Sequence, residues 1–243
     1  MDLSVLRDDM VDSLEHESKG CVHSETVSVA MRTVPRHAFV EDERAAYADR
    51  AFERLGTRVL APSTVGRLLE ALAPEPDNSV LVVGAGVGYT TAVLAEIVGS
   101  HNVQAVDITR RLVYEARENL SKAGYEGVLV DCRDGASGFP EYAPYDRILL
   151  EAAAVRPPQA LLDQLHEDGT LVMPLGAHQQ SLALVDTEGA VERLGGCAFA
   201  PMLVEGEQAD VVERNRTRRE DREFARRSAR RRKGWELDWI DWD

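Results

Sequence analysis

The hydrophobic positions of this chain form runs and repeats that alternate between strand and helix. Val80 to Val83 is an unbroken aliphatic run, typical of a strand buried on both faces of a parallel sheet. The run stops at Gly84, and apolar residues recur at helical spacing from Tyr89 to Val98. Val103 to Asp107 then predicts a second strand that ends in a carboxylate. This order of strand, glycine turn, helix and strand predicts an α/β unit that binds a nucleotide-like cofactor.

Further elements follow from the same patterns on either side of this unit. Towards the N-terminus we expect two helices, one from Met1 to near Gly20 and one over Val27 to Thr33, opened by Ser24. After the unit we expect a helix over Leu112 to Ala123 and a strand over Val128 to Val130.

The spacing of the glycines narrows the choice of ligand. Gly84, Gly86 and Gly88 form G-x-G-x-G, not the G-x-G-x-x-G of dinucleotide folds, and no P-loop Lys-Ser/Thr follows. A carboxylate about 20 residues on, here Asp107, is the usual partner of a ribose diol. The pattern therefore favours S-adenosylmethionine over NAD or ATP. A tight turn without a ligand is the alternative.

The composition indicates the habitat and compartment of the protein, and says little about its substrate. The 243 residues carry a net charge of −14, with 42 acidic and 28 basic residues. Such acidity, with arginine strongly preferred over lysine, is typical of salt-adapted organisms. Cys21, Cys132 and Cys197 show neither disulfide nor zinc spacing, and the histidines show no metal spacing. Without an apolar leader or a run of ~18 apolar residues, we expect a cytoplasmic protein that binds no metal and no membrane.

Several separated motifs resemble one family in order. Arg32 to Val40 reads Arg-x-Val-Pro-Arg-x-x-Phe-Val, and Tyr-x-Asp follows at Tyr47 to Asp49. Both resemble the amino-terminal signature of protein-L-isoaspartate O-methyltransferases. Gly56 to Pro62 occupies the place of that family's Gly-Gln-Thr-Ile-Ser-Gln/Ala-Pro loop, and Arg133 to Gly135 resembles its Gly-Asp-Gly. The likeness covers roughly residues 27–204 and suggests a divergent member of haloarchaeal type.

The resemblance implies a Rossmann-like class I methyltransferase, an α/β fold whose central, mostly parallel sheet has helices on both faces. It implies an N-terminal helical region over 1–76, a cofactor-binding core over 77–205 and a C-terminal extension over 206–243. The remaining elements are expected as two helices and four strands: Val65 to Leu72, Pro158 to Leu165, Pro144 to Ala153, Gly169 to Gly176, Gln180 to Val185 and Ala198 to Val204.

The function implied by the resemblance is S-adenosylmethionine-dependent methylation of L-isoaspartyl residues in damaged proteins. A carboxylate acceptor is already ionised at neutral pH, so the enzyme mainly positions the reactants and needs no general base. The cofactor would be bound by Gly84, Ala85, Gly86, Gly88, Asp107, Ile108, Asp134 and Gly135. The substrate would be bound by Thr57, Arg58, Val59, Leu60 and Ala61.

Two departures from the family's pattern fall in this site. The loop serine that contacts the acceptor carboxyl is Leu60 here, and the loop threonine is Arg58. Arg58 and Ser63 are therefore the candidate catalytic residues, since a guanidinium can hold a carboxylate with two hydrogen bonds. Arg58 as a surface arginine is equally open. The acidic residue usual in the first core strand is Val82, which removes one polar contact to the methionine end of the cofactor.

Two other functions remain open from the sequence. The altered loop and the C-terminal extension suit a cofactor-binding relative that recruits a protein partner. In that extension an Arg-rich segment, residues 213–233 with 11 basic and 4 acidic residues, precedes Trp235, Trp239 and Trp242. A methyltransferase with another acceptor, such as nucleic acid, is the second alternative. Glu151 to Ala154 stands where a base-modifying enzyme has Asn/Asp-Pro-Pro-Tyr/Phe, and the acidic body repels phosphate, so nucleic acid is disfavoured.

Overall fold

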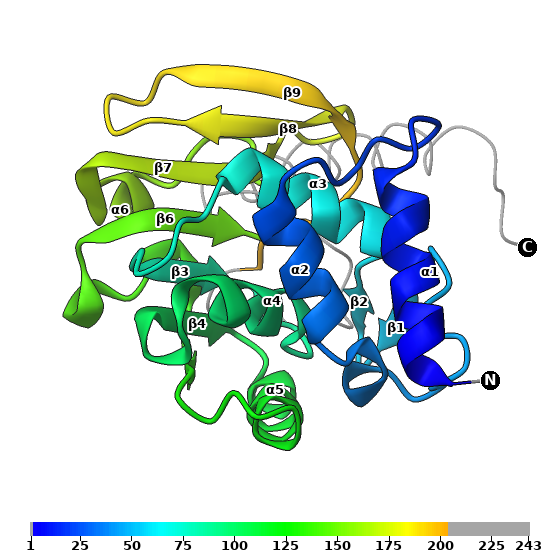
Figure 1. Cartoon of the computed structure of the whole chain (residues 1–243). Helices are drawn as coiled ribbons and strands as arrows, with labels where there is room; N and C mark the ends of the chain where they lie inside the picture. The colour runs from blue at the N-terminus through cyan, green and yellow to red at the C-terminus, as the bar shows by residue number, and fades with distance from the viewer. Residues whose placement is uncertain (1, 204–243) are drawn as a thin grey trace, which may run out of the picture.

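A seven-stranded sheet forms the centre of the computed structural model, which describes residues 2–203 (Figure 1). The predicted C-terminal extension, with its arginines and tryptophans, lies outside the described residues. The strand order is β5-β4-β3-β6-β7-β8-β9, with β3 to β7 mutually parallel and the pairs β7/β8 and β8/β9 antiparallel. The strands are β3 (Val80–Val83), β4 (Val103–Asp107), β5 (Leu129–Cys132), β6 (Tyr145–Leu150), β7 (Leu165–Leu175), β8 (Gln180–Val185) and β9 (Val191–Cys197).

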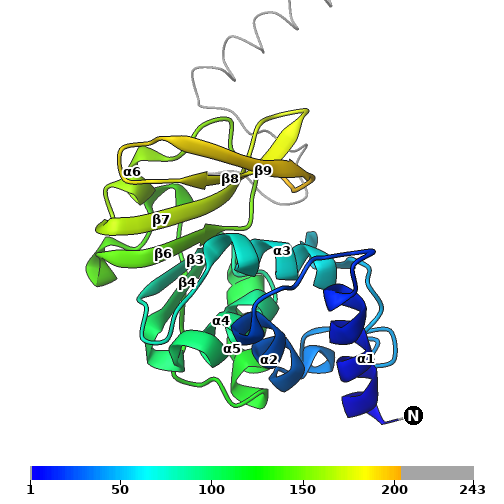
Figure 2. The same ribbon diagram turned by 45° about the horizontal axis from the view of Figure 1, so that its top comes forward.

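Alternate residues of the central strands feed two separate core clusters. Val80 and Val82 of β3 face the larger cluster, which the longer helices cover, and Leu81 and Val83 face the smaller one. The second face is covered by α6 and by short 3-10 turns (Figure 2). The helices are α1 (Leu3–Glu15), α2 (Glu25–Thr33), α3 (Pro62–Leu72), α4 (Tyr89–Val98), α5 (Arg110–Lys122) and α6 (Gln159–Leu162). The predicted Rossmann-like arrangement, with helices on both faces, is confirmed.

The N-terminal helices pack into the same core cluster as the sheet. Side chains of α1, α2 and α3 lie in the larger cluster with the inward valines of β3 and β4. Residues of the predicted regions 1–76 and 77–205 therefore share one core. None of the helices in the described part of the chain has the length and apolar character that crossing a bilayer demands.

The Val-Pro-Arg motif buries an arginine beneath the loop that precedes α3. Arg36 has no solvent exposure. Its Nε donates to the carbonyl of Ala46 at 2.9 Å, its Nη2 donates to the carbonyl of Leu60 at 2.6 Å, and its guanidinium lies 4.4 Å from the ring centroid of Tyr89. Burial lowers the pKa of Arg36. One side chain thus ties two N-terminal loops to the start of α4.

A short hairpin, which the hydrophobic pattern did not reveal, precedes α3. Strands β1 (Phe52–Arg54) and β2 (Thr57–Val59) pair antiparallel across a two-residue turn. Leu55 and Gly56 in that turn have φ of 49° and 80°, the left-handed pair that a tight hairpin turn needs. The strands are three residues each, too short for an alternating pattern to stand out in the sequence.

Several predicted element bounds are wrong, among them the strand expected from Gly169, which begins at Leu165. The first helix ends at Glu15, because His16 adopts extended backbone and a turn reaches Gly20 at φ 50°. The helix expected to reach Leu165 ends at Leu162, and Leu165 begins β7.

A further error concerns the last strand of the sheet. It is Val191–Cys197, not Ala198 to Val204. Nearly all of β9 is exposed at the sheet edge and it contains two glycines, so no hydrophobic run marked it. Residues 198–203 instead form an irregular segment, held to Ala153 by two backbone hydrogen bonds of 2.8 and 2.9 Å.

Candidate functional site

The candidate site is a pocket at the carboxyl ends of β3, β4 and β6. The chain runs outward from β3 through β4 to β5 and then returns to β6 on the other side of β3. This reversal of strand order is where open α/β sheets bind their ligands. The lining residues come from six segments: Gly56, Thr57, Val83, Gly84, Val106, Asp107, Ile108, Thr109, Leu112, Gly135, Leu150, Glu151, Ala152, Ala200, Pro201, Met202 and Leu203.

The glycine turn brings backbone, not side chains, to the pocket. Gly84, Gly86 and Gly88 have φ of 90°, 53° and 94°, a conformation that residues with a Cβ rarely adopt. The N–H groups of Gly84 and Ala85 donate to the carbonyl of Val106 at 2.8 and 3.1 Å. Gly88 is the N-cap of α4. The turn therefore crosses the end of β4 and leaves one side open towards the pocket.

Asp107 fixes the turn and also faces the pocket. Its Oδ2 accepts from the N–H of Gly86 at 3.0 Å, and its Oδ1 accepts from the N–H of Thr109 at 2.8 Å. Each carboxylate oxygen keeps a further acceptor position, which suits a diol that donates two hydrogen bonds. Burial raises the pKa of Asp107, opposed by the same two N–H groups.

Asp134 shapes the loop beside the pocket. Its side chain accepts from the N–H of Ala136 at 2.8 Å and caps the short helix that begins at Gly135. Gly135 lines the pocket, and a Cβ there would collide with Cγ1 of Val83. Close backbone packing against β3 therefore requires glycine at this position.

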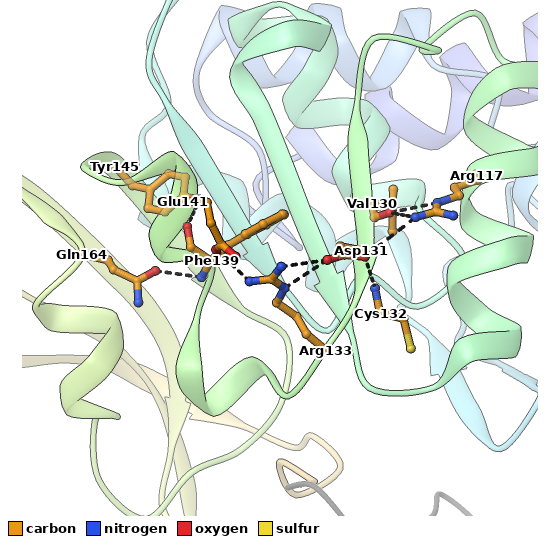
Figure 3. A network of polar contacts seen from close by, with 9 residues as sticks. All are labelled: Arg117, Val130, Asp131, Cys132, Arg133, Phe139, Glu141, Tyr145 and Gln164. Carbon is orange, nitrogen blue, oxygen red and sulfur yellow. Dashed lines mark hydrogen bonds and ion pairs between the residues drawn. The ribbon is translucent and has the colours of Figure 1, made fainter.

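A polar network holds that loop in place (Figure 3). Arg133 donates to Asp131 and to Glu141 at 2.8 to 3.1 Å, and its guanidinium lies 3.8 Å from the ring centroid of Phe139. The backbone N–H of Phe139 donates to Oε1 of Gln164 at 2.7 Å. Arg133 is thus a positioning residue for the Asp134–Gly135 turn.

Glu151 is an acid of this pocket that the sequence reading did not assign. It follows β6 directly, and its backbone N–H donates to the carbonyl of Val83 at 2.8 Å. Its Oε1 is enclosed and has no hydrogen-bond partner among the described residues. Burial raises the pKa of Glu151 to about 7, with the hydroxyl of Thr90 lowering it and the charge of Asp107 raising it. Glu151 belongs to no motif that marks a cofactor ligand, so its place in the pocket was not predicted from the sequence.

The predicted substrate loop lies partly in the pocket and partly beside it. Thr57 lines the pocket, whereas Arg58 is exposed and lines a neighbouring groove with Glu53, Arg54 and Phe199. Gly56, Thr57 and Ala200 line both hollows, so the groove adjoins the pocket.

The rest of the loop lies outside both hollows. Val59 is buried in the core, Leu60 packs against it, and neither lines the pocket or the groove, nor does Ala61. The N–H of Ser63 donates to Asp49 at 2.9 Å at the start of α3. Burial raises the pKa of Asp49, but hydrogen bonds from Lys19 and Ser63 outweigh it and keep that pKa below its usual value.

The structure thus gathers four of the eight predicted cofactor residues on the pocket wall: Gly84, Asp107, Ile108 and Gly135. Ala85, Gly86, Gly88 and Asp134 lie behind them and shape the turns. Ala200 to Leu203 also line the pocket, although the sequence predicts a strand over Ala198 to Val204. Nothing in a short Ala-Pro-Met-Leu segment indicates that it crosses a pocket.

The pocket fits the predicted cofactor by its charge. Of the described residues that line it, Asp107 and Glu151 are the two that ionise, and both are acids. A site without a lining arginine or lysine is poorly suited to the phosphates of NAD or ATP, and well suited to a nucleoside that carries positive charge. S-adenosylmethionine is such a nucleoside: it carries positive charge and has no phosphate. In residues 2–203 no cluster of three or more metal-ligating side chains occurs.

Comparison with known proteins agrees with this site. Residues 7–208 match the model of the family described as protein-L-isoaspartate(D-aspartate) O-methyltransferase. The protein-L-isoaspartate O-methyltransferase of Methanosarcina mazei is 40% identical over 206 residues, covering 82% of this chain and 83% of that protein. The Methanopyrus kandleri protein of the same name is 43% identical over 209 residues, covering 82% and 92%.

A solved structure shares the fold. It comes from Plasmodium falciparum, is described as a protein-L-isoaspartate O-methyltransferase in complex with S-adenosyl-L-homocysteine, and gives a TM-score of 0.73 at 21% identity. The match covers 81% of this chain and 98% of that one.

Proposed function

Because the chain belongs to the protein-L-isoaspartate(D-aspartate) O-methyltransferase family, we propose that it transfers a methyl group from S-adenosylmethionine to the free carboxylate of L-isoaspartyl residues in proteins. The observation that carries this proposal is the acidic pocket at the ends of β3, β4 and β6, which opens next to a groove at the β1–β2 hairpin. Donor and acceptor can then meet at Gly56, Thr57 and Ala200, which both hollows share.

The residues of the pocket would bind and orient the reactants. Asp107 would accept hydrogen bonds from the ribose hydroxyls, while Ile108 and Gly135 would pack against the base. The sulfonium of the bound cofactor supplies the methyl group in an in-line displacement, for which the acceptor carboxylate needs no deprotonation. The hairpin and the segment Ala200 to Leu203 would exclude water from the donor.

The transfer itself is tested with a matched pair of peptides. We expect labelled methyl to pass from S-adenosylmethionine to a peptide with one isoaspartyl residue and not to its normal aspartyl twin, since the groove would select the displaced carboxylate. The assay counts methyl incorporated per peptide at high salt. Equal labelling of both peptides would contradict isoaspartyl selection, and labelling of neither would favour a cofactor-binding relative without turnover.

Arg58 is the proposed holder of the acceptor carboxylate. Its side chain is exposed in the groove, so the guanidinium is accessible to a carboxylate. We expect Arg58→Ala to raise KM for the isoaspartyl peptide about tenfold and to leave cofactor affinity unchanged, as one charged hydrogen bond is lost. Arg111, an exposed arginine of α5, provides the control as Arg111→Ala. Unchanged kinetics for Arg58→Ala would make Arg58 a surface residue.

Leu60→Ser restores the hydroxyl that the family's loop carries at this position. We propose that Leu60→Ser maintains or raises activity. Ser63 remains the second candidate catalytic residue near the loop.

We also propose that the protein works in the cytoplasm and that its C-terminal tryptophan segment contacts a protein partner. The haloarchaeal origin stays a prediction.

A further inference from the structure

The carboxyl of Glu151 lacks a donor for one of its oxygens. Oε1 is shielded from solvent and no described residue donates to it, whereas buried acceptors normally have a partner. The hydroxyl of Thr90, in the first turn of α4, is the described group that hydrogen-bonds the carboxyl. A ligand that donates a hydrogen bond to this oxygen would therefore be favoured in the pocket.

The position of Glu151 in the sheet indicates which part of a ligand it meets. The predicted base and ribose contacts, Ile108, Gly135 and Asp107, lie at the ends of β4 and β5. Glu151 lies at the end of β6, on the opposite side of β3. An elongated ligand with its nucleoside over β4 therefore extends its other end across β3 towards Glu151.

The chemistry of that other end selects the interaction. In S-adenosylmethionine it is an amino acid, whose α-ammonium is an N–H donor, whereas the sulfonium has no hydrogen to donate. The facing strand β3 offers no polar side chain, because Val82 is buried in the core. Resting on the proposed function, we propose that the Glu151 carboxylate binds the α-ammonium of the cofactor's methionyl end, and so replaces an acid that β3 lacks.

The charges around Glu151 make its binding role depend on pH. Asp107 at the end of β4 is the other ionisable group on the pocket wall, and the hairpin and the segment over Ala200 to Leu203 add none within the described residues. With a pKa of about 7, Glu151 is mostly neutral in the empty pocket at lower pH and ionises above it. A bound ammonium stabilises the ionised form, so affinity rises with pH across this range.

The same burial predicts that Glu151 costs stability when the pocket is empty. Its folded pKa is raised above the unfolded value, so the native state binds more protons and stability falls as pH rises towards about 7. We therefore expect Glu151→Gln to melt no lower than wild type at pH 8 without ligand. A merely structural glutamate would instead lose stability on this change.

The test is calorimetry with two ligands that differ at the methionyl end. S-adenosylhomocysteine carries the ammonium without a sulfonium, and 5′-methylthioadenosine carries neither. We expect Glu151→Gln to weaken S-adenosylhomocysteine about tenfold or more at pH 8 and to leave 5′-methylthioadenosine unchanged. Wild-type affinity for S-adenosylhomocysteine is expected to rise between about pH 6 and pH 8, and the variant's to stay flat. Exposed Glu167→Gln on β7 is the matched control.

Each outcome decides a different point. Equal affinity of Glu151→Gln and wild type for S-adenosylhomocysteine would overturn the role. Equal weakening of both ligands would assign Glu151 to the nucleoside and would overturn the ammonium contact. Absence of any binding by wild type would overturn the proposed function together with this inference.

Discussion

Replacing Asp107 with alanine is expected to weaken S-adenosylhomocysteine binding about a hundredfold. The change removes the acceptor proposed for the ribose and also releases the N–H groups of Gly86 and Thr109, which it now holds at 3.0 and 2.8 Å. Two charge-assisted hydrogen bonds are together worth about 3 kcal/mol, which corresponds to a factor of about a hundred in affinity. The measurement is calorimetric titration at high salt.

Two further variants separate ligand contact from loss of the turn. Asp163→Ala, which removes a carboxylate outside the pocket, controls for net charge and is expected to bind as wild type. Asp107→Asn keeps the size of the side chain but turns one acceptor oxygen into a donor, so we expect intermediate binding. If Asp107→Ala binds S-adenosylhomocysteine within threefold of the wild-type affinity, Asp107 does not bind the cofactor.

Replacing Arg36 with alanine is expected to lower the free energy of unfolding by about 3 kcal/mol. The substitution leaves the carbonyls of Ala46 and Leu60 without their donor and opens a cavity beside Tyr89. Unpaired carbonyls together with a cavity at a fully buried position lower the free energy of unfolding more than an ordinary surface substitution does. Chemical denaturation measures it, and Arg111→Ala on the exposed side of α5 is expected to stay within about 0.5 kcal/mol of wild type.

The outcome for Arg36 bears on the loop as well as on stability. Because its Nη2 holds the carbonyl of Leu60, the loop before α3 is expected to loosen with the arginine removed. A loss below about 1 kcal/mol would mean that water replaces the guanidinium and that the Val-Pro-Arg motif does not fix this region.

The core of the fold was predictable because its sequence signals are local. The bounds of Val80 to Val83, Tyr89 to Val98 and Val103 to Asp107 agree with the structure to the residue. A strand buried on both faces, a glycine turn and a largely buried helix fit few other arrangements. The placement of Asp107 beside that turn followed from the same segment.

The parts that failed depend on contacts between distant residues. Strand β9 is exposed and polar, and it is a strand because the edge of β8 pairs with it along its whole length. In the sequence, Glu151 indicates only that a base-modifying loop is absent. Glu151 lines the pocket and is buried between Thr90 of α4 and Asp107 of β4, and no local sequence pattern records these contacts between distant segments.

The decisive measurement is a crystal structure of the chain with S-adenosylhomocysteine and an isoaspartyl peptide. We predict the nucleoside in the pocket at the ends of β3, β4 and β6, with its ribose hydroxyls on Asp107 and the isoaspartyl carboxylate in the groove beside Arg58. Nucleoside density elsewhere on the protein, or a peptide bound on a face away from the β1–β2 hairpin, would contradict it.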